Sequence, residues 1–252
     1  MYNLVKATVI AAIFAISPPA LAFDLDAMTD QEKDQFGQQV REYLLQNPEV
    51  IMQVFSILEQ RQQAAELQED ATLVSAYLPE IQNDGYSWIG GNPDGDITLV
   101  EFLDYKCGYC RKAHNEVANL VKTDGNIKLV VKEFPILSEA SYDLSRAAVA
   151  TLQSLGSDAY KKMYNQFIKH DGPVTDEVIT FLANKVNLDG QIIVAQMDNP
   201  SVAEQIAKTR QLGEDLNING TPTFIINGEI VRGYVPADTM KSIIAELRTQ
   251  TQ

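Results

Sequence analysis

The chain is constrained most by a pair of cysteines that lies between a predicted strand and a predicted helix. Cys107 and Cys110 are the only cysteines in the sequence. The run Ile97 to Phe102 before them is apolar and β-branched, which predicts a buried strand. Apolar residues follow at helical spacing, namely Ala113, Val117, Leu120 and Val121. The partial positive charge of a helix N-terminus favours a thiolate, and Lys106, Arg111 and Lys112 add cations around it. This position predicts a reactive dithiol.

Two other interpretations of the pair remain open at this point. A structural disulfide is disfavoured, because a two-residue loop removes little entropy from the unfolded chain. A zinc or copper site is disfavoured because a closed zinc site takes four ligands. Such a site would need Cys107, Cys110, His114 and His170, which are all the cysteines and histidines of the chain. We interpret His114 as an ordinary helix residue near the pair and His170 as a solvated residue of a polar turn.

Two further features bear on the same site. Glu101 lies inside the apolar strand, where a carboxylate is costly unless it has a role. It is either a buried acid that exchanges a proton with Cys110, or a residue that strand alternation turns to solvent. Thr221 and Pro222 come directly before a predicted strand. Pro222 is either an ordinary residue at a strand start or the second residue of a functional cis bond.

Three segments together resemble the DsbA family of thioredoxin-fold proteins, and more narrowly its oligomeric ScsC-like branch with an N-terminal helical extension. They are FLDYKCGYC, then KEFPIL from Lys132, then GTPTFIING from Gly220. The resemblance implies that Cys107 attacks, that Cys110 resolves, and that Thr221 with a cis Pro222 contacts substrate. It also places Glu101 at the family's buried acid. The residues between the cysteines, Gly108 and Tyr109, depart from the Pro-His of the prototype oxidase.

The first residues predict export. Residues 1–22 have the pattern of a signal peptide, with Lys6, a short apolar run and a small-residue cleavage site at Ala20–Ala22. Export to an oxidising compartment allows a disulfide to persist, and we interpret that compartment as a bacterial periplasm. The formal charge of −14 becomes −15 once Lys6 is removed (−14 − 1), which argues against nucleic acid as a partner.

Residues 23–82 are predicted to form an N-terminal helical arm. Thr29 and Glu32 make a capping-box pattern, and Asn47-Pro48 separates two amphipathic helices. Their apolar faces need cover, either within a globular domain of their own or against another copy of the chain. The resemblance favours a homo-oligomer, with a dimer preferred and a trimer as the alternative.

Residues 83–252 are predicted to form the catalytic domain, an α/β thioredoxin fold with helices inserted at about 138–215. Trp88 and Ile89 are expected in the core, and Thr175 and Ser201 are expected to cap helices. Asn227-Gly228 predicts a hairpin between the strands Thr223–Ile226 and Glu229–Arg232. A last helix from about Ala237 to Thr249 completes the fold.

These features predict a thiol–disulfide oxidoreductase of exported proteins that needs no organic cofactor and no metal. Its expected partners are exported substrates with thiols or disulfides and a membrane redox protein of the oxidase or reductase type. The competing hypotheses are a periplasmic copper or zinc carrier that uses the same two cysteines, and an envelope interaction protein with a vestigial redox site. The balance between oxidation and isomerisation stays open.

Overall fold

The computed structural model describes residues 28–250, which form two compact units divided between Arg61 and Gln62. The predicted signal peptide, residues 1–22, lies outside the described residues. The first unit holds α1 (Asp30–Gln46) and the first part of α2 (Glu49–Ala76). Thr29 and Glu32 form the predicted capping box at the start of α1, and the chain breaks between the helices at Asn47-Pro48, as predicted.

The second unit is built around a five-stranded sheet with the strand order β1-β3-β2-β4-β5. Strands β2 and β3 are parallel, and the other neighbouring pairs are antiparallel. The strand bounds are β1 Trp88–Gly91, β2 Ile97–Leu103, β3 Ile127–Glu133, β4 Thr223–Ile226 and β5 Glu229–Arg232. The hairpin of β4 and β5 has the predicted bounds, with Asn227 and Gly228 both at positive φ in its turn.

Helices cover both faces of this sheet, which therefore separates two apolar clusters. Alternation along β2 sends Leu99 and Leu103 into one cluster, which includes residues of α4 and α10. The same alternation sends Val100 and Phe102 into the other, which includes residues of α2, α3 and α9. The bounds of these shorter helices are α3 Leu78–Gln82, α4 Gly108–Asp124, α9 Pro200–Asp215 and α10 Ala237–Gln250.

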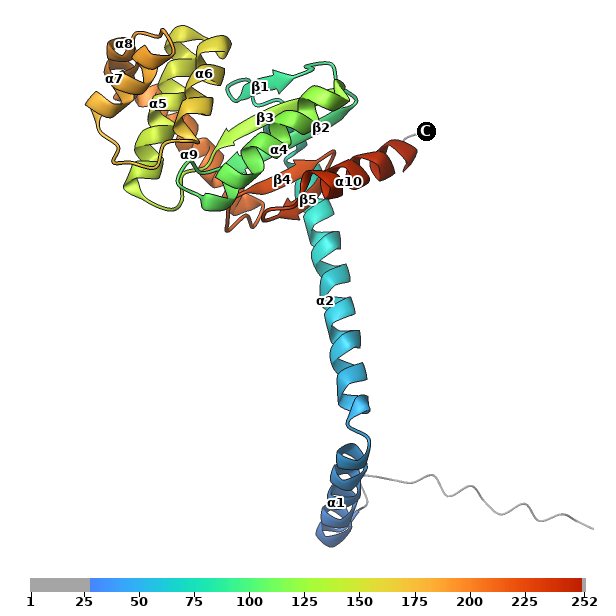
Figure 1. The fold of residues 1–252 in the computed structure, drawn as a ribbon. Coiled ribbons are helices and arrows are strands. Elements are labelled where there is room, and N and C mark those ends of the chain that lie inside the picture. The colour runs from blue at the N-terminus through green and yellow to red at the C-terminus, as the bar shows by residue number, and fades with distance from the viewer. Residues whose placement is uncertain (1–27, 251–252) are drawn as a thin grey trace, which may run out of the picture. The chain divides into compact units, whose positions relative to one another are not determined.

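Five helices lie between β3 and β4 in the sequence and gather beside the sheet (Figure 1). The last of the five is α9, and the four before it are α5 Glu139–Leu155, α6 Ser157–Phe167, α7 Asp176–Lys185 and α8 Gly190–Met197. This insertion and the β-α-β and β-β-α parts around it confirm the predicted fold class, a thioredoxin fold with inserted helices and an N-terminal helical segment.

Two local predictions in this unit were wrong. Trp88 is buried, but its neighbour Ile89 is 39% exposed, because β1 is an edge strand whose side chains alternate between core and solvent. Thr175 caps α7 as expected, whereas α9 is capped by Asn199, with Pro200 at its first position and Ser201 inside the helix. Proline is favourable at the first helical position, so the cap falls one residue before it.

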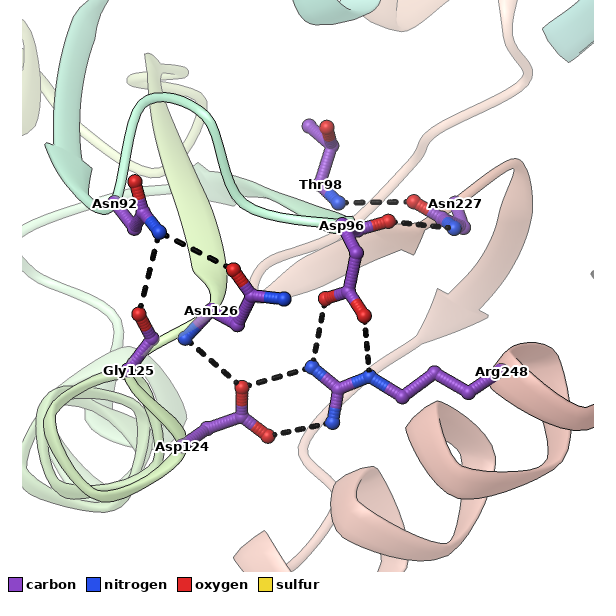
Figure 2. Close-up of polar contacts among 8 residues, drawn as sticks. All are labelled: Asn92, Asp96, Thr98, Asp124, Gly125, Asn126, Asn227 and Arg248. Carbon is purple, nitrogen blue, oxygen red and sulfur yellow. Dashed lines mark hydrogen bonds and ion pairs between the residues drawn. The ribbon is translucent and has the colours of Figure 1, made fainter.

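A polar cluster joins the last helix to the β-α-β unit (Figure 2). The Arg248 guanidinium of α10 donates to both carboxylate oxygens of Asp96 at 2.8–2.9 Å and to both of Asp124 at 2.8 Å. The Asn227 side chain accepts from the backbone N–H of Thr98 at 2.9 Å. These contacts hold α10 against the end of α4 that lies away from the cysteines, and they hold the hairpin turn against the start of β2.

Candidate active site

Cys107 is the N-cap of α4, and Cys110 lies in the first turn of that helix. Both cysteines are free thiols and both are buried, Cys107 with 7% and Cys110 with 0% of its surface exposed. The loop before them is held by Asp104, whose fully buried carboxylate accepts from the backbone N–H groups of Lys106, Ile136 and Leu137 at 2.8–3.0 Å. These three hydrogen bonds fix the loop that leads into Cys107 at the start of α4.

The other half of the site is the loop before β4. The Thr221–Pro222 peptide bond is cis, as the family resemblance implied. The Cys107 thiol donates to the backbone carbonyl of Thr221 at 3.0 Å, so this loop and the start of α4 are in direct contact. The Thr221 hydroxyl oxygen is buried and has no hydrogen-bond partner among the described residues, which leaves it able to donate to a thiolate.

The pKa values of the two cysteines are shifted in opposite directions. The hydrogen bond from the Cys110 side chain, supported by Thr221 and by backbone N–H groups, lowers the pKa of Cys107 to about 5. Burial, with further contributions from Cys107 and Glu101, raises the pKa of Cys110 far above the usual range. Near neutral pH the Cys107 sulfur is therefore a thiolate, and the Cys110 sulfur is a protonated thiol.

The cations near the pair have other partners. Lys106 donates to the carbonyl of Gly172 at 2.8 Å, and Arg111 pairs with Asp171 at 2.5 Å. The Lys112 ammonium lies 4.1 Å from the centroid of the Tyr234 ring. The contributions that lower the pKa of Cys107 most are hydrogen bonds from the Cys110 and Thr221 side chains and from the backbone at the start of α4.

Glu101 points into the core below the cysteines, because β2 is buried on both faces. It is 1% exposed, so the interpretation that strand alternation turns it to solvent was wrong. Burial raises the pKa of its carboxyl group to about 7, and the hydroxyl of Tyr164, donating at 3.3 Å, opposes this rise. A buried group with this pKa is able to gain and lose a proton near neutral pH.

A second buried acid, Glu133 at the end of β3, was missed by the sequence analysis. Its carboxylate accepts from the hydroxyls of Tyr105 at 2.7 Å, Tyr160 at 2.5 Å and Ser145 at 2.7 Å. Burial raises its pKa to about 7, and its charge raises the pKa of Glu101 in turn. The signal in the sequence was a charged residue at the end of a buried strand, but its partners lie 12 to 28 residues away.

The residues between the cysteines lie at the surface. Tyr109 is 63% exposed and stacks on Tyr234, with ring centroids 6.2 Å apart. Space beside Gly108 is open. His114 is buried, and His170 is half-buried with a ring nitrogen 2.8 Å from the carbonyl of Pro173. The described residues contain no group of three or more His, Cys, Asp or Glu side chains that could hold a metal ion.

Family models match most of this chain. A model described as Thioredoxin matches residues 82–246, and one described as Copper resistance protein ScsC N-terminal domain matches residues 32–65. Among curated proteins, disulfide bond formation protein D of Bacillus subtilis is 21% identical over 164 residues, which cover 61% of this chain and 73% of that protein. The Na(+)/H(+) antiporter NhaA 1 of Salinispora arenicola is 23% identical over 157 residues, which cover 62% of this chain.

The chain spans only about a quarter of the length of the antiporters that it matches, 24% in that case. Within residues 28–250, none of the helices has both the length and the apolar character that a membrane crossing requires.

Three solved structures share the fold. A thioredoxin-like oxidoreductase of Silicibacter pomeroyi DSS-3 is 34% identical with a TM-score of 0.63, covering 68% of this chain and 97% of that one. The thiol-disulfide exchange protein alpha-DsbA2 of Wolbachia pipientis is 26% identical with a TM-score of 0.67, covering 73% and 98%. A linker-deletion mutant of ScsC from Proteus mirabilis is 21% identical with a TM-score of 0.68, covering 89% and 98%. By its sequence and by its sheet, the chain thus belongs to the thioredoxin family, as a DsbA- and ScsC-like member with an N-terminal helical extension.

Proposed function

We propose that this protein is a thiol–disulfide oxidoreductase in which Cys107 is the nucleophile and Cys110 resolves. The observation that carries the proposal is the contrast between the two sulfurs. The pKa of Cys107 is lowered to about 5, while the neighbouring Cys110 stays protonated. A thiolate attacks disulfides, whereas a protonated and buried thiol does not attack until it loses its proton.

The exchange proceeds in two balanced steps. The Cys107 thiolate attacks a substrate disulfide, forms a mixed disulfide and releases one substrate sulfur as a thiolate. Cys110 then loses its proton and attacks the Cys107 sulfur, which releases the second substrate thiolate and leaves the pair as a disulfide. The substrate has been reduced and the enzyme oxidised. The same steps in reverse introduce a disulfide into a dithiol substrate.

Glu101 is proposed as the proton acceptor and donor for Cys110. Both groups are buried in the core, and the charge of the Glu101 carboxylate adds to the raised pKa of Cys110, which supports this role. With a pKa of about 7, the carboxyl group is able to take the proton as Cys110 attacks and to return it in the reverse step.

Thr221, Pro222, Gly108 and Tyr109 are proposed to contact the substrate. The first two lie against the nucleophile, as the bond from the Cys107 thiol to the Thr221 carbonyl indicates. The other two lie at the exposed start of α4, where a polypeptide is able to approach without displacing a side chain. An extended segment of substrate laid along the Thr221 backbone would bring its disulfide to Cys107.

We further propose that the protein acts in the periplasm on exported proteins, in exchange with a membrane redox protein. Residues 23–82 are proposed as an arm that makes a homo-oligomer, a dimer by preference and a trimer as the alternative. Large apolar side chains are exposed along α1 and the first part of α2, among them Phe36, Tyr43, Met52 and Phe55. Two active sites on one assembly raise the effective concentration for a second contact with a misfolded substrate, which favours isomerisation.

Trapping of the mixed disulfide tests the exchange. Reduced Cys110→Ala should accumulate a mixed disulfide with a peptide whose cysteine is activated as an aryl disulfide, because Cys107 displaces the aryl thiolate, and added reductant should release the peptide. Cys107→Ala should form none, because the remaining thiol is buried and protonated. Equal trapping by both variants would contradict the assigned roles.

Substitution on the arm tests the oligomer without touching the catalytic unit. Phe55 and Met52 are 59% and 68% exposed within the first unit. Charging both, in Met52→Glu with Phe55→Glu, should give a monomer that still oxidises a dithiol peptide but refolds a scrambled disulfide substrate poorly. The matched control is Gln62→Glu with Gln63→Glu, two exposed residues of the same helix that also gain two charges. An unchanged mass in sedimentation, or unchanged isomerisation by a monomer, would refute the role of the arm.

A second candidate, a copper or zinc carrier, is favoured by one observation only. The family model that matches residues 32–65 is described as part of a copper resistance protein. Metal analysis of the purified reduced protein, together with a thiol count, separates the two functions. Bound metal at one equivalent per Cys107–Cys110 pair, lost on alkylation, would support the carrier.

A further inference from the structure

A hydroxyl from the inserted helices reaches the buried acid below the cysteines. Tyr164 lies on α6, and its hydroxyl donates to Oε2 of Glu101 at 3.3 Å. No other donor to this carboxylate occurs among the described residues. Both side chains lie in the core, Glu101 with 1% and Tyr164 with 5% of its surface exposed. A carboxylate without water around it depends on such a donor, because nothing else offsets the loss of its hydration.

The Tyr164 hydroxyl keeps its proton, so it is a donor at every pH near neutrality. Burial raises its pKa well above the ordinary value for tyrosine, and the charges of Glu101, Cys110 and Glu133 raise it further. A hydroxyl donates more strongly to an ionised carboxylate than to a neutral carboxyl group. The hydrogen bond therefore favours the ionised form of Glu101, against the effect of burial.

Four ring contacts fix the position of this hydroxyl. The Tyr164 ring stacks on Trp88 at 6.1 Å and on Tyr160 at 6.2 Å between centroids. It packs edge-on against His114 at 4.7 Å and against Tyr105 at 6.3 Å. These partners come from β1, α6, α4 and the loop after β2, so the ring is packed from several sides. The hydroxyl is thus placed by the core and not by its hydrogen bond alone.

Tyr160 offers a comparison on the same helix. It lies one turn before Tyr164, is 1% exposed and stacks on the same Trp88 ring at 5.3 Å. Its hydroxyl, however, donates to the other buried acid, Glu133, at 2.5 Å. Loss of that donor would favour the neutral form of Glu133 and so weaken a charge that raises the pKa of Glu101. The two hydroxyls therefore act on Glu101 in opposite directions.

The other groups around Glu101 keep their charge state near neutral pH or are followed through Glu133. Burial lowers the pKa of His114 and raises those of Tyr105, Tyr160 and Tyr164, so these four stay uncharged at pH 7. Helices α5 and α10 have no buried titratable residue. Glu133, with a pKa of about 7, is the neighbour whose charge changes over the same pH range. The titratable groups on the elements packed around Glu101 are Cys107, Cys110 and His114 of α4, Glu133 of β3, Tyr160 and Tyr164 of α6, and Asp104 and Tyr105 of the loop after β2.

We propose that Tyr164 is a positioning residue of the exchange reaction, which holds the Glu101 carboxylate ionised and in place to take the proton of Cys110. The proton moves from the Cys110 sulfur to Glu101 as Cys110 attacks the Cys107 sulfur and the substrate thiolate leaves. The Tyr164 hydroxyl donates throughout and gives up no proton. This role rests on the proposed function of Glu101, and two separate measurements distinguish the failure of one from the failure of the other.

The first measurement follows the charge of Glu101 directly. The infrared band of its protonated carboxyl group is titrated in the reduced protein and assigned by its loss in Glu101→Gln. Tyr164→Phe removes the hydroxyl and keeps the ring, and it should raise the midpoint of this titration by about one pH unit. Tyr160→Phe is the matched control and should leave the midpoint unchanged or lower it. Replacement of Tyr164 by 3-fluorotyrosine, whose hydroxyl is a stronger donor, should lower it and does not depend on how Tyr164→Phe folds.

The second measurement follows the proton transfer. Reduced protein is mixed rapidly with a peptide activated as an aryl disulfide, which releases the aryl thiolate as Cys107 attacks and the peptide thiol as Cys110 resolves. Tyr164→Phe should release the peptide about fivefold more slowly than wild type at pH 7, and at a similar rate at pH 9, where Glu101 is ionised in both. Release of the aryl thiolate should be unchanged, because it precedes the step in which Glu101 acts.

The outcomes separate the two claims. An unchanged midpoint in Tyr164→Phe, or equal shifts in Tyr164→Phe and Tyr160→Phe, would overturn the role of Tyr164. A raised midpoint with an unchanged rate of peptide release at pH 7 would overturn the proposed function of Glu101 and, with it, the place of Tyr164 in the reaction. A slow release that does not recover at pH 9 would point to a structural defect and would also count against the proposal.

Discussion

The lowered pKa of Cys107 predicts a larger fraction of thiolate at pH 7 than a free cysteine has. A free cysteine has a pKa of about 8.5, so about 3% of it is thiolate at pH 7. With a pKa of about 5, about 99% of Cys107 is thiolate at the same pH, a roughly 30-fold increase in the reactive form. The largest single contribution to this low pKa is the hydrogen bond from the Cys110 side chain. Cys110→Ala should therefore raise the pKa of Cys107, while the remaining donors keep it below that of a free cysteine.

The same shift stabilises the reduced folded protein. A depressed pKa contributes stability that is fully present above the unfolded pKa of about 8.5 and is lost as the pH falls through the folded pKa of about 5. At pH 7 the contribution is about 1.4 kcal/mol for each of about two pH units, roughly 3 kcal/mol. This term favours the dithiol over the disulfide, so it makes the disulfide a stronger oxidant.

Two measurements check this reasoning. Ultraviolet absorbance of the thiolate against pH gives the pKa of Cys107 in the reduced wild type and in Cys110→Ala. Urea unfolding of reduced wild type and of Cys107→Ser, at pH values from 4 to 9, gives the difference in unfolding free energy, in which most other titrating groups cancel. A wild-type pKa near 8.5, or a stability difference that does not grow with pH, would refute the argument.

Three further predictions concern Thr221, Glu101 and the buried ion pair of Lys132 with Asp84. Thr221→Val should raise the pKa of Cys107, because the threonine side chain contributes to lowering it, and alkylation rates against pH would detect the change. Glu101→Gln should stabilise the protein more at pH 8 than at pH 5, since the raised pKa of this buried acid costs stability as the pH rises; urea unfolding at the two pH values tests the sign. Lys132→Met should lower the unfolding free energy by about 3 kcal/mol, because it leaves the Asp84 carboxylate buried without its ion pair, and Lys132→Arg is the control.

Local patterns in the sequence were enough for the elements that carry the site. The strand before Cys107, the helix that starts there and the Asn-Gly hairpin depend on neighbours a few residues apart, and each was found within a few residues of its bounds. The cap of α9 shows where such reasoning fails. Asn199 and Ser201 are both good N-cap residues, and only the position of Pro200 between them decides which one begins the helix.

Contacts between distant residues could not be found in this way. Lys132 and Asp84 form a 2.5 Å ion pair from opposite ends of a segment that includes β2 and α4, and nothing near either residue marks the other. The partners of Glu133 come from the loop after β2 and from α5 and α6. Burial predicted that a charge in an apolar strand needs partners, but not which hydroxyls supply them.

In the proposed exchange, the two buried acids Glu101 and Glu133 account for the ability of Cys110 to lose and regain its proton. An ionised Glu101 would raise the pKa of Cys110 and hinder the loss of its proton, while a protonated Glu101 has no capacity to accept that proton. A useful acid must therefore exist in both forms at the working pH, which requires a pKa near neutrality. Burial raises the pKa of Glu101 most, the Tyr164 hydroxyl lowers it, and the charges of Glu133 and Cys107 raise it further, to about 7. Glu133 is held by its three hydroxyl donors, so it adds to the proton affinity of Glu101 from a fixed position in the core.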